Sequence, residues 1–102
     1  MDVPDTNPKG KKMNTSFTPT PDLAARIDRI LQGAIDPHVH SGPSIAPRAI
    51  DHLELARQAS AAGFSAVVTK DHDYAGTATA ILINDNFPEL KTKVYTSLVL
   101  NN

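Results

Sequence analysis

The stretch "FSAVVTK" (residues 64–70) decides the fold class of this 102-residue chain. It is short, rich in β-branched residues and apolar at successive positions, which is typical of a strand buried on both faces of a parallel sheet. Gly63, directly before it, predicts the end of a helix, because glycine readily adopts the left-handed conformation found there. A helix should therefore precede this strand, and the polar residues 71–73 follow it.

Helices and strands are predicted to alternate on both sides of this strand. The apolar spacing indicates a helix that starts at Thr20-Pro21 and stops at Gly33, a second over residues 48–62 and a third over 77–86. Short apolar segments at 34–39 and "VYTSLVL" (94–100) are predicted as the other two strands. Each strand–helix unit is about 30 residues long, the usual length of a βαβ repeat. The expected fold class is therefore α/β with a parallel sheet.

Three strands alone leave two unpaired edges and much apolar surface. A closed TIM-type (β/α) barrel usually needs about 250 residues, so we expect the first three βα units of such a barrel, incomplete in this chain. The alternative is a small three-stranded α/β domain that depends on self-association. Residues 1–19, rich in Pro, Asn, Thr and Lys, are predicted to be a flexible tail, and 20–102 the partial domain.

The composition is that of an ordinary globular protein, with 40% hydrophobic and 21% charged residues. A net charge of -1 argues against a general nucleic-acid or membrane-surface binder. Because the chain has no cysteine, any metal must be held by nitrogen and oxygen ligands. Without a bilayer-length apolar run or the apolar core of a signal peptide, a cytoplasmic location is expected.

The first predicted strand ends in a histidine pair, within "IDPHVHSGPS" (35–44). Side chains alternate along a strand, so Asp36, His38 and His40 are expected on one face. Imidazoles two residues apart lie roughly 6 to 7 Å apart, which lets both converge on one ion or one metal pair. Asp36 could then accept a ring N–H and fix the tautomer of a ligand. By itself the pair also fits a polar strand end, but a Gly-Pro loop follows it, and barrel enzymes keep their chemistry in such loops.

The second strand ends in "TKDHD" (69–73), and the same alternation places Lys70 and His72 on one face and Asp71 on the other. A second imidazole-bearing strand end, one βα unit after the first, is what a shared metal site requires. A polar turn, or an aspartate that caps the next helix, is the simpler interpretation. Arg48 could bind an anionic substrate group or be a plain surface residue, and His52 is interpreted as an ordinary helix-face histidine.

These motifs resemble a known group of enzymes. "DPHVHSGPS" with "AAGFSAVVTKDHD" is similar to the opening of amidohydrolase-type metal-dependent hydrolases and of polymerase-and-histidinol-phosphatase (PHP) phosphoesterases. Both groups carry His-x-His at the end of the first barrel strand, and the PHP type adds Thr-Asp-His after the second. The resemblance extends from about Gly33 to Asn102, and is strongest to an uncharacterised amidohydrolase-like branch. It implies that His38, His40 and His72 are metal ligands and that Asp71 matches the PHP aspartate.

The chain also departs from these families. Lys70 stands between Thr69 and Asp71, where the PHP motif has no residue, and the bridging lysine of amidohydrolases usually lies on a later strand. Pro37 removes a backbone donor from a strand that should be central. The ligands and catalytic aspartate of later strands are absent from these 102 residues. The resemblance implies Lys70 and Asp71 as the candidate catalytic residues.

The resemblance implies the N-terminal part of a divalent-metal-dependent hydrolase. It would hydrolyse an amide, ester or phosphoester of a small-molecule substrate with a water whose pKa the metal lowers. Zinc is the expected ion for imidazole ligands, with manganese or iron as alternatives. The competing hypothesis is a catalytically inactive fragment or a small self-associating α/β domain, and neither hypothesis includes a nucleic-acid or membrane partner.

Overall fold

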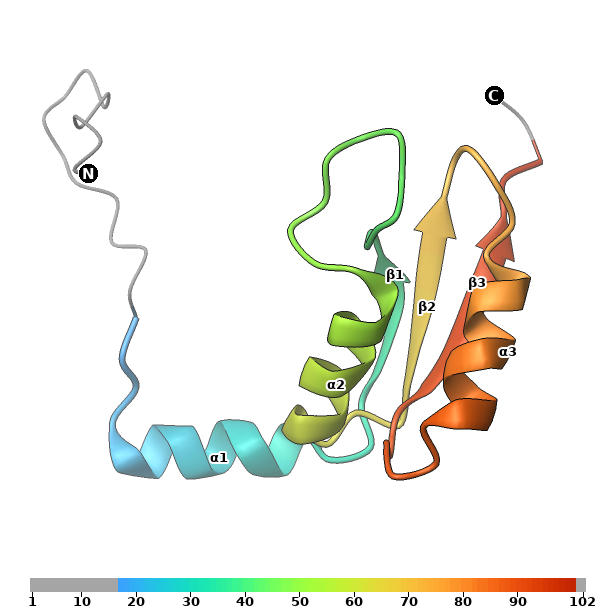
Figure 1. The fold of residues 1–102 in the computed structure, drawn as a ribbon. Coiled ribbons are helices and arrows are strands. Elements are labelled where there is room, and N and C mark those ends of the chain that lie inside the picture. Colours follow the sequence, from blue (N-terminus) through green and yellow to red (C-terminus); the bar gives the residue numbers. More distant parts are fainter. Residues whose placement is uncertain (1–16, 101–102) are drawn as a thin grey trace, which may run out of the picture.

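A computed structural model describes residues 17–100, in which helices and strands alternate along the chain (Figure 1). The elements are α1 (Pro21–Leu31), β1 (Ile35–Val39), α2 (His52–Ala62), β2 (Ala66–Asp71), α3 (Thr77–Asn86) and β3 (Lys93–Leu98). The tail predicted over residues 1–19 lies almost wholly outside the described residues. Within residues 17–100, no helix has the length and apolarity needed to cross a membrane.

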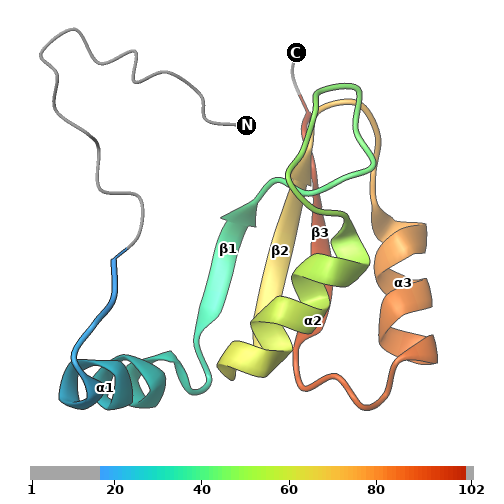
Figure 2. The same ribbon diagram turned by 60° about the vertical axis from the view of Figure 1, so that its left-hand side comes forward.

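The three strands form one open parallel sheet in the order β1-β2-β3. β2 lies in the centre and pairs with β3 without interruption from Ala66↔Lys93 to Asp71↔Leu98. Helices α2 and α3 lie on the same face of this sheet, and the loops that follow β1 and β2 meet at its carboxyl end (Figures 1 and 2). The predicted α/β class, with three parallel βα units, is confirmed.

Local capping signals set where the helices begin and end. The Thr20 side chain accepts a hydrogen bond from the N–H of Leu23, so α1 starts where the sequence predicts. Asp51 caps α2 in the same way by accepting from Glu54 at 2.7 Å, so this helix begins at His52 rather than at the predicted residue 48. Gly63 has a φ of 92° and ends α2 in the left-handed conformation, as predicted.

The core lies between the sheet and the pair α2 and α3. It consists of small or branched side chains that are at most 8% exposed, namely Ala56, Ala59, Val67, Ala80, Ile83 and Val94. The alanines let the helices approach the sheet closely, and Val67 on β2 is 1% exposed. On the strands outside this core, Ile35 and Tyr95 remain 61% and 55% exposed. The sheet is therefore covered on one side within the described residues.

Helix α1 stands apart from this core at the end of the sheet where the strands begin (Figures 1 and 2). It forms as predicted, but none of its residues is buried, and Ile30 of its apolar stripe is 76% exposed. The chain after α1 is tied to the end of α2, because the N–H of Gly33 donates to the carbonyl of Gly63 at 2.8 Å. The apolar stripe thus contributes little to the packing of the described fold.

We predict that Ile83→Ala lowers the free energy of unfolding by about 2–5 kcal/mol, because it leaves a cavity in the core. Ile30→Ala, on the exposed stripe of α1, should change it by no more than about 0.5 kcal/mol. Urea unfolding followed by circular dichroism measures both values. Equal losses for the two variants would contradict this account of the core.

Candidate metal centre

The pairing of β1 with β2 is interrupted just before the histidines. Asp36 lies opposite Val67 and Val39 lies opposite Thr69, so β1 uses three residue steps where β2 uses two. Pro37 sits in this irregularity, where a missing N–H breaks no regular ladder bond. β1 is also an edge strand of the described sheet and not a central one, which removes the difficulty that the sequence raised.

The structure brings His38 and His40 together. Their Nε2 atoms are 3.2 Å apart, and the ring centroids are separated by 5.1 Å with the rings at 71°. An ion about 2.0–2.1 Å from each nitrogen, with a tetrahedral angle between them, requires nitrogens about 3.3 Å apart. The spacing of the two Nε2 atoms therefore suits a shared ion such as zinc.

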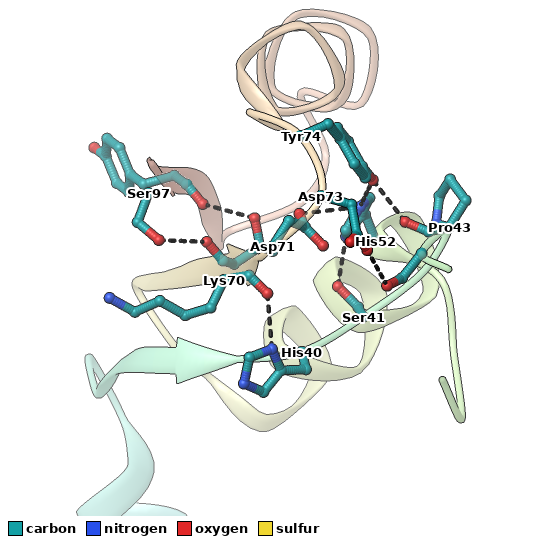
Figure 3. A network of polar contacts seen from close by, with 12 residues as sticks. His40, Ser41, Pro43, His52, Lys70, Asp71, Asp73, Tyr74 and Ser97 are labelled. Carbon is teal, nitrogen blue, oxygen red and sulfur yellow. Dashed lines mark hydrogen bonds and ion pairs between the residues drawn. The ribbon is translucent and has the colours of Figure 1, made fainter. Parts of the chain in front are cut away.

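A backbone carbonyl orients the second of these rings. His40 Nδ1 lies 2.7 Å from the carbonyl oxygen of Lys70 (Figure 3). A carbonyl only accepts, so Nδ1 carries the proton and Nε2 presents its lone pair to an ion. This orienting role was predicted for Asp36, whose carboxylate instead accepts the backbone N–H of His38 at 3.0 Å. The physical reason is the register shift between Asp36 and Val39. Asp36 precedes it and pairs with Val67, a residue of the helix-covered face, so the simple alternation no longer places Asp36 on the face of the two histidines.

His72 lies beside the pair, but its ring nitrogens are not directed at the point on which His38 and His40 converge. Its ring stacks on His40, with centroids 5.7 Å apart and planes within 17°. Imidazole lone pairs lie in the plane of the ring, so two stacked rings direct them side by side. Across residues 17–100, no group of three or more His, Cys, Asp or Glu side chains is arranged to hold a metal ion. The structure thus provides two converging donors with a third imidazole next to them.

The remaining predicted residues are Lys70, near the end of β2, and Arg48, in the loop after β1. The Lys70 side chain points away from His52 (Figure 3), and its backbone carbonyl is the atom that contacts His40. Arg48 is half-buried in the loop after β1, where its Nε is buried without a hydrogen-bond partner. This loop lines an open hollow of about 480 Å³, to which Ser44 also contributes. Arg48 Nε is therefore a buried donor without a hydrogen-bond partner in the described structure.

Sequence reasoning missed the part played by His52. It is 3% exposed, its Nδ1 is 2.5 Å from Ser41 Oγ, and its Nε2 is 2.9 Å from the Tyr74 hydroxyl. Tyr74 in turn donates to the carbonyl of Pro43 at 2.6 Å (Figure 3). The interpretation of His52 as an ordinary helix-face residue is wrong. The available signal was Asp51, since an N-cap there makes His52 the first helical residue, next to the strand ends.

Asp71 is an unusual feature of the same region. It is 2% exposed, and neither of its carboxylate oxygens has a hydrogen-bond partner. Oδ2 is 3.9 Å from His52 Nε2, and a Cβ at Gly76 would come within 3.4 Å of Oδ2. Buried carboxylates are normally paired and hydrogen-bonded, so an exception of this kind often marks a functional position. Asp71 therefore remains a candidate functional residue, with a carboxylate that is buried among other side chains.

Residues 33–102 match the model of a family of unknown function, DUF6282. The chain belongs to this family. No curated protein and no solved structure gave a significant match. The DUF6282 region begins just before β1 and contains every candidate site residue described above, while α1 lies outside it.

Tyr74 should titrate above the ordinary tyrosine range. Burial raises its pKa above 10.0, and the negative charges of Asp71 and Asp73 add to the effect. The Tyr95→Phe variant has Tyr74 as its sole tyrosine. Phenolate absorbance of the folded variant should therefore give a titration midpoint above pH 10.0. In urea the midpoint should return to about 10. A folded-state midpoint at or below that of the unfolded chain would contradict the described environment.

The raised pKa of Tyr74 also affects how folding stability depends on pH. Below pH about 10 the phenol is neutral in both states, so its contribution to stability is complete. As the pH rises further, the unfolded chain loses the proton first, and folding stability falls until the folded Tyr74 also ionises. This loss should be smaller in Tyr74→Phe, as measured by unfolding at successive pH values.

We predict that Asp71→Asn raises the free energy of unfolding by about 1–2 kcal/mol at neutral pH. A buried carboxylate without hydrogen bonds is costly, and a neutral amide costs less to bury. Asp73→Asn is the control, because Asp73 is exposed and its change should stay within about 0.5 kcal/mol. A loss of stability in Asp71→Asn would contradict this prediction, because it would show that other groups of the folded chain stabilise the Asp71 carboxylate.

Proposed function

We propose that this chain carries the first-strand part of the metal site of a divalent-metal-dependent hydrolase, of the amidohydrolase or PHP type. The observation that carries the proposal is the 3.2 Å separation of His38 Nε2 and His40 Nε2, with His40 Nδ1 held by the Lys70 carbonyl. The similarity of "DPHVHSGPS" and "TKDHD" to the strand ends of these enzymes supports it.

The donor set suits a borderline divalent ion. Two imidazoles favour zinc, and manganese or iron are the alternatives. Catalytic zinc sites usually have three protein ligands, and His72, stacked on His40, is the nearest third imidazole described. When bound, the ion would supply a Lewis acid for hydrolysis of an amide, ester or phosphoester.

Other residues support a small anionic substrate. Arg48 has a buried Nε without a partner, and a guanidinium in that condition binds carboxylate or phosphate oxygens well. The hollow beside it, about 480 Å³, falls within the usual range of ligand sites. Lys70 is a half-buried residue near the end of β2, and its backbone carbonyl contacts His40. These two cations are the proposed contacts for the negative charge of the substrate.

A second candidate is a non-enzymatic α/β domain that associates with itself. The observation that favours it is the exposed apolar surface, including Ile35, Tyr95 and Ile30. A parallel sheet is normally covered on both faces, so a second copy could cover the bare side. Sedimentation of the purified chain distinguishes a monomer from such an assembly.

The metal site predicts a specific binding defect. His38→Ala and His40→Ala should each weaken Zn²⁺ or Co²⁺ binding by at least about tenfold, because each removes one of the two converging donors. Competition with a chromogenic chelator measures the affinity. Asp36→Asn is the matched control on the same strand, because its amide oxygen can still accept the His38 N–H.

The hydrolase assignment needs a second measurement. A panel of amide, ester and phosphoester substrates, assayed with added Zn²⁺ or Mn²⁺, should show activity that the double variant H38A/H40A lacks. Hydrolysis or metal affinity that is unchanged in the double variant would overturn the proposal.

A further inference from the structure

We infer that His52 is a positioning residue that holds the His38–His40 pair in its metal-binding arrangement, an inference that rests on the proposed function. His52 comes from α2, between the two strand-end motifs, and belongs to neither of them. It is nonetheless 3% exposed and contacts the loops that follow both strands.

The first set of contacts fixes the residues directly after His40. Ser41 is the next residue in the chain, it is fully buried, and its Oγ lies 2.5 Å from His52 Nδ1. The backbone N–H of His52 also donates to the Gly42 carbonyl at 2.8 Å. The side chain and the backbone of His52 therefore both hold the segment that directly follows His40.

The second set of contacts reaches the loop after β2. His52 Nε2 lies 2.9 Å from the hydroxyl of Tyr74, two residues beyond His72. The same hydroxyl donates to the Pro43 carbonyl at 2.6 Å, which joins the two loops a second time (Figure 3). His52 thus links the strand end that bears the pair to the strand end that bears His72.

The hydrogen bonds assign a proton to each atom. The Tyr74 proton goes to Pro43, so His52 Nε2–H must donate to the Tyr74 oxygen. Nδ1 then accepts the hydroxyl proton of Ser41. Both ring nitrogens of His52 are engaged in hydrogen bonds. His52 therefore supports the His38–His40 pair and is not itself a metal ligand.

Two amide variants separate the two sets of contacts. The amide of asparagine occupies the position of Nδ1, and that of glutamine occupies the position of Nε2. His52→Asn should therefore keep the Ser41 contact, and His52→Gln should keep the Tyr74 contact. Because Ser41 adjoins His40, we expect Co²⁺ affinity within about threefold of the unmodified chain for Asn, and a loss of about tenfold or more for Gln.

A metal-free readout accompanies the Co²⁺ titration. The Nδ1–H of His40, bonded to the Lys70 carbonyl, gives a ¹⁵N-resolved proton signal that should persist in His52→Asn and weaken or shift in His52→Gln. Val94→Ala is the stability control, because Val94 is a buried core residue at the start of β3, the end of the sheet opposite the histidines. It should lower the unfolding midpoint while leaving the His40 signal and the Co²⁺ affinity of the folded chain unchanged.

The outcomes keep the two proposals apart. If the unmodified chain binds no Co²⁺ but the His40 signal still depends on position 52, the metal site is wrong and the positioning of His40 stands. If Co²⁺ binds and the Asn and Gln variants match the unmodified chain in affinity and in the His40 signal, the role of His52 is overturned. Equal defects in both variants would overturn the assignment of the positioning to the Ser41 contact, which only His52→Asn keeps.

Discussion

The hydrogen bond from His40 Nδ1 to the Lys70 carbonyl joins the ends of β1 and β2, and the candidate site depends on it. Parallel strands bring their carboxyl ends to one edge, so the loops after β1 and β2 must meet there. This bond turns that general proximity into a defined ring orientation, because a carbonyl can only accept. The 3.2 Å approach of the two Nε2 atoms and the stacking of His72 both involve the ring that it fixes.

At this end of the sheet, a group of polar residues supports the histidines. His52, Ser41 and Tyr74 satisfy one another's hydrogen bonds, whereas the buried Asp71 carboxylate has no hydrogen-bond partner and lies 3.9 Å from His52 Nε2. Satisfied buried networks fix a unique local structure, whereas a buried carboxylate without hydrogen bonds costs stability. The carboxyl end of the sheet therefore combines a rigid support with a costly carboxylate, while the apolar core lies elsewhere, between the helices and the sheet.

Much of the fold could be predicted because its signals are local. The Thr20 cap, the left-handed Gly63 and the apolar run before Lys70 each act within a few residues, and α3 has the predicted bounds. The 30-residue spacing of the strand ends was sufficient to predict the parallel sheet. Of the candidate site, the convergence of His38 and His40 followed from the strand period alone.

The rest could not be predicted because it arises from tertiary contacts. The register shift at Pro37 breaks the simple alternation, so Asp36 turns to a backbone N–H instead of an imidazole. The Asp51 cap indicates where α2 begins, but the burial of His52 arises from its contacts with Ser41 and Tyr74, which lie in the loops after two different strands. The exposure of the α1 stripe likewise depends on what packs against it, and helical periodicity carries no information about that partner.

The pairing of β1 with β2 also has a consequence for how the chain folds. His40 and Lys70 are 30 positions apart, so their contact can form only after a long loop has closed around α2. Local helices form within about a microsecond, whereas pairings of large sequence separation are intrinsically slow. The orientation of the His40 ring can therefore be fixed only after β1 and β2 have paired, whereas the turns of α2 can form from local contacts alone.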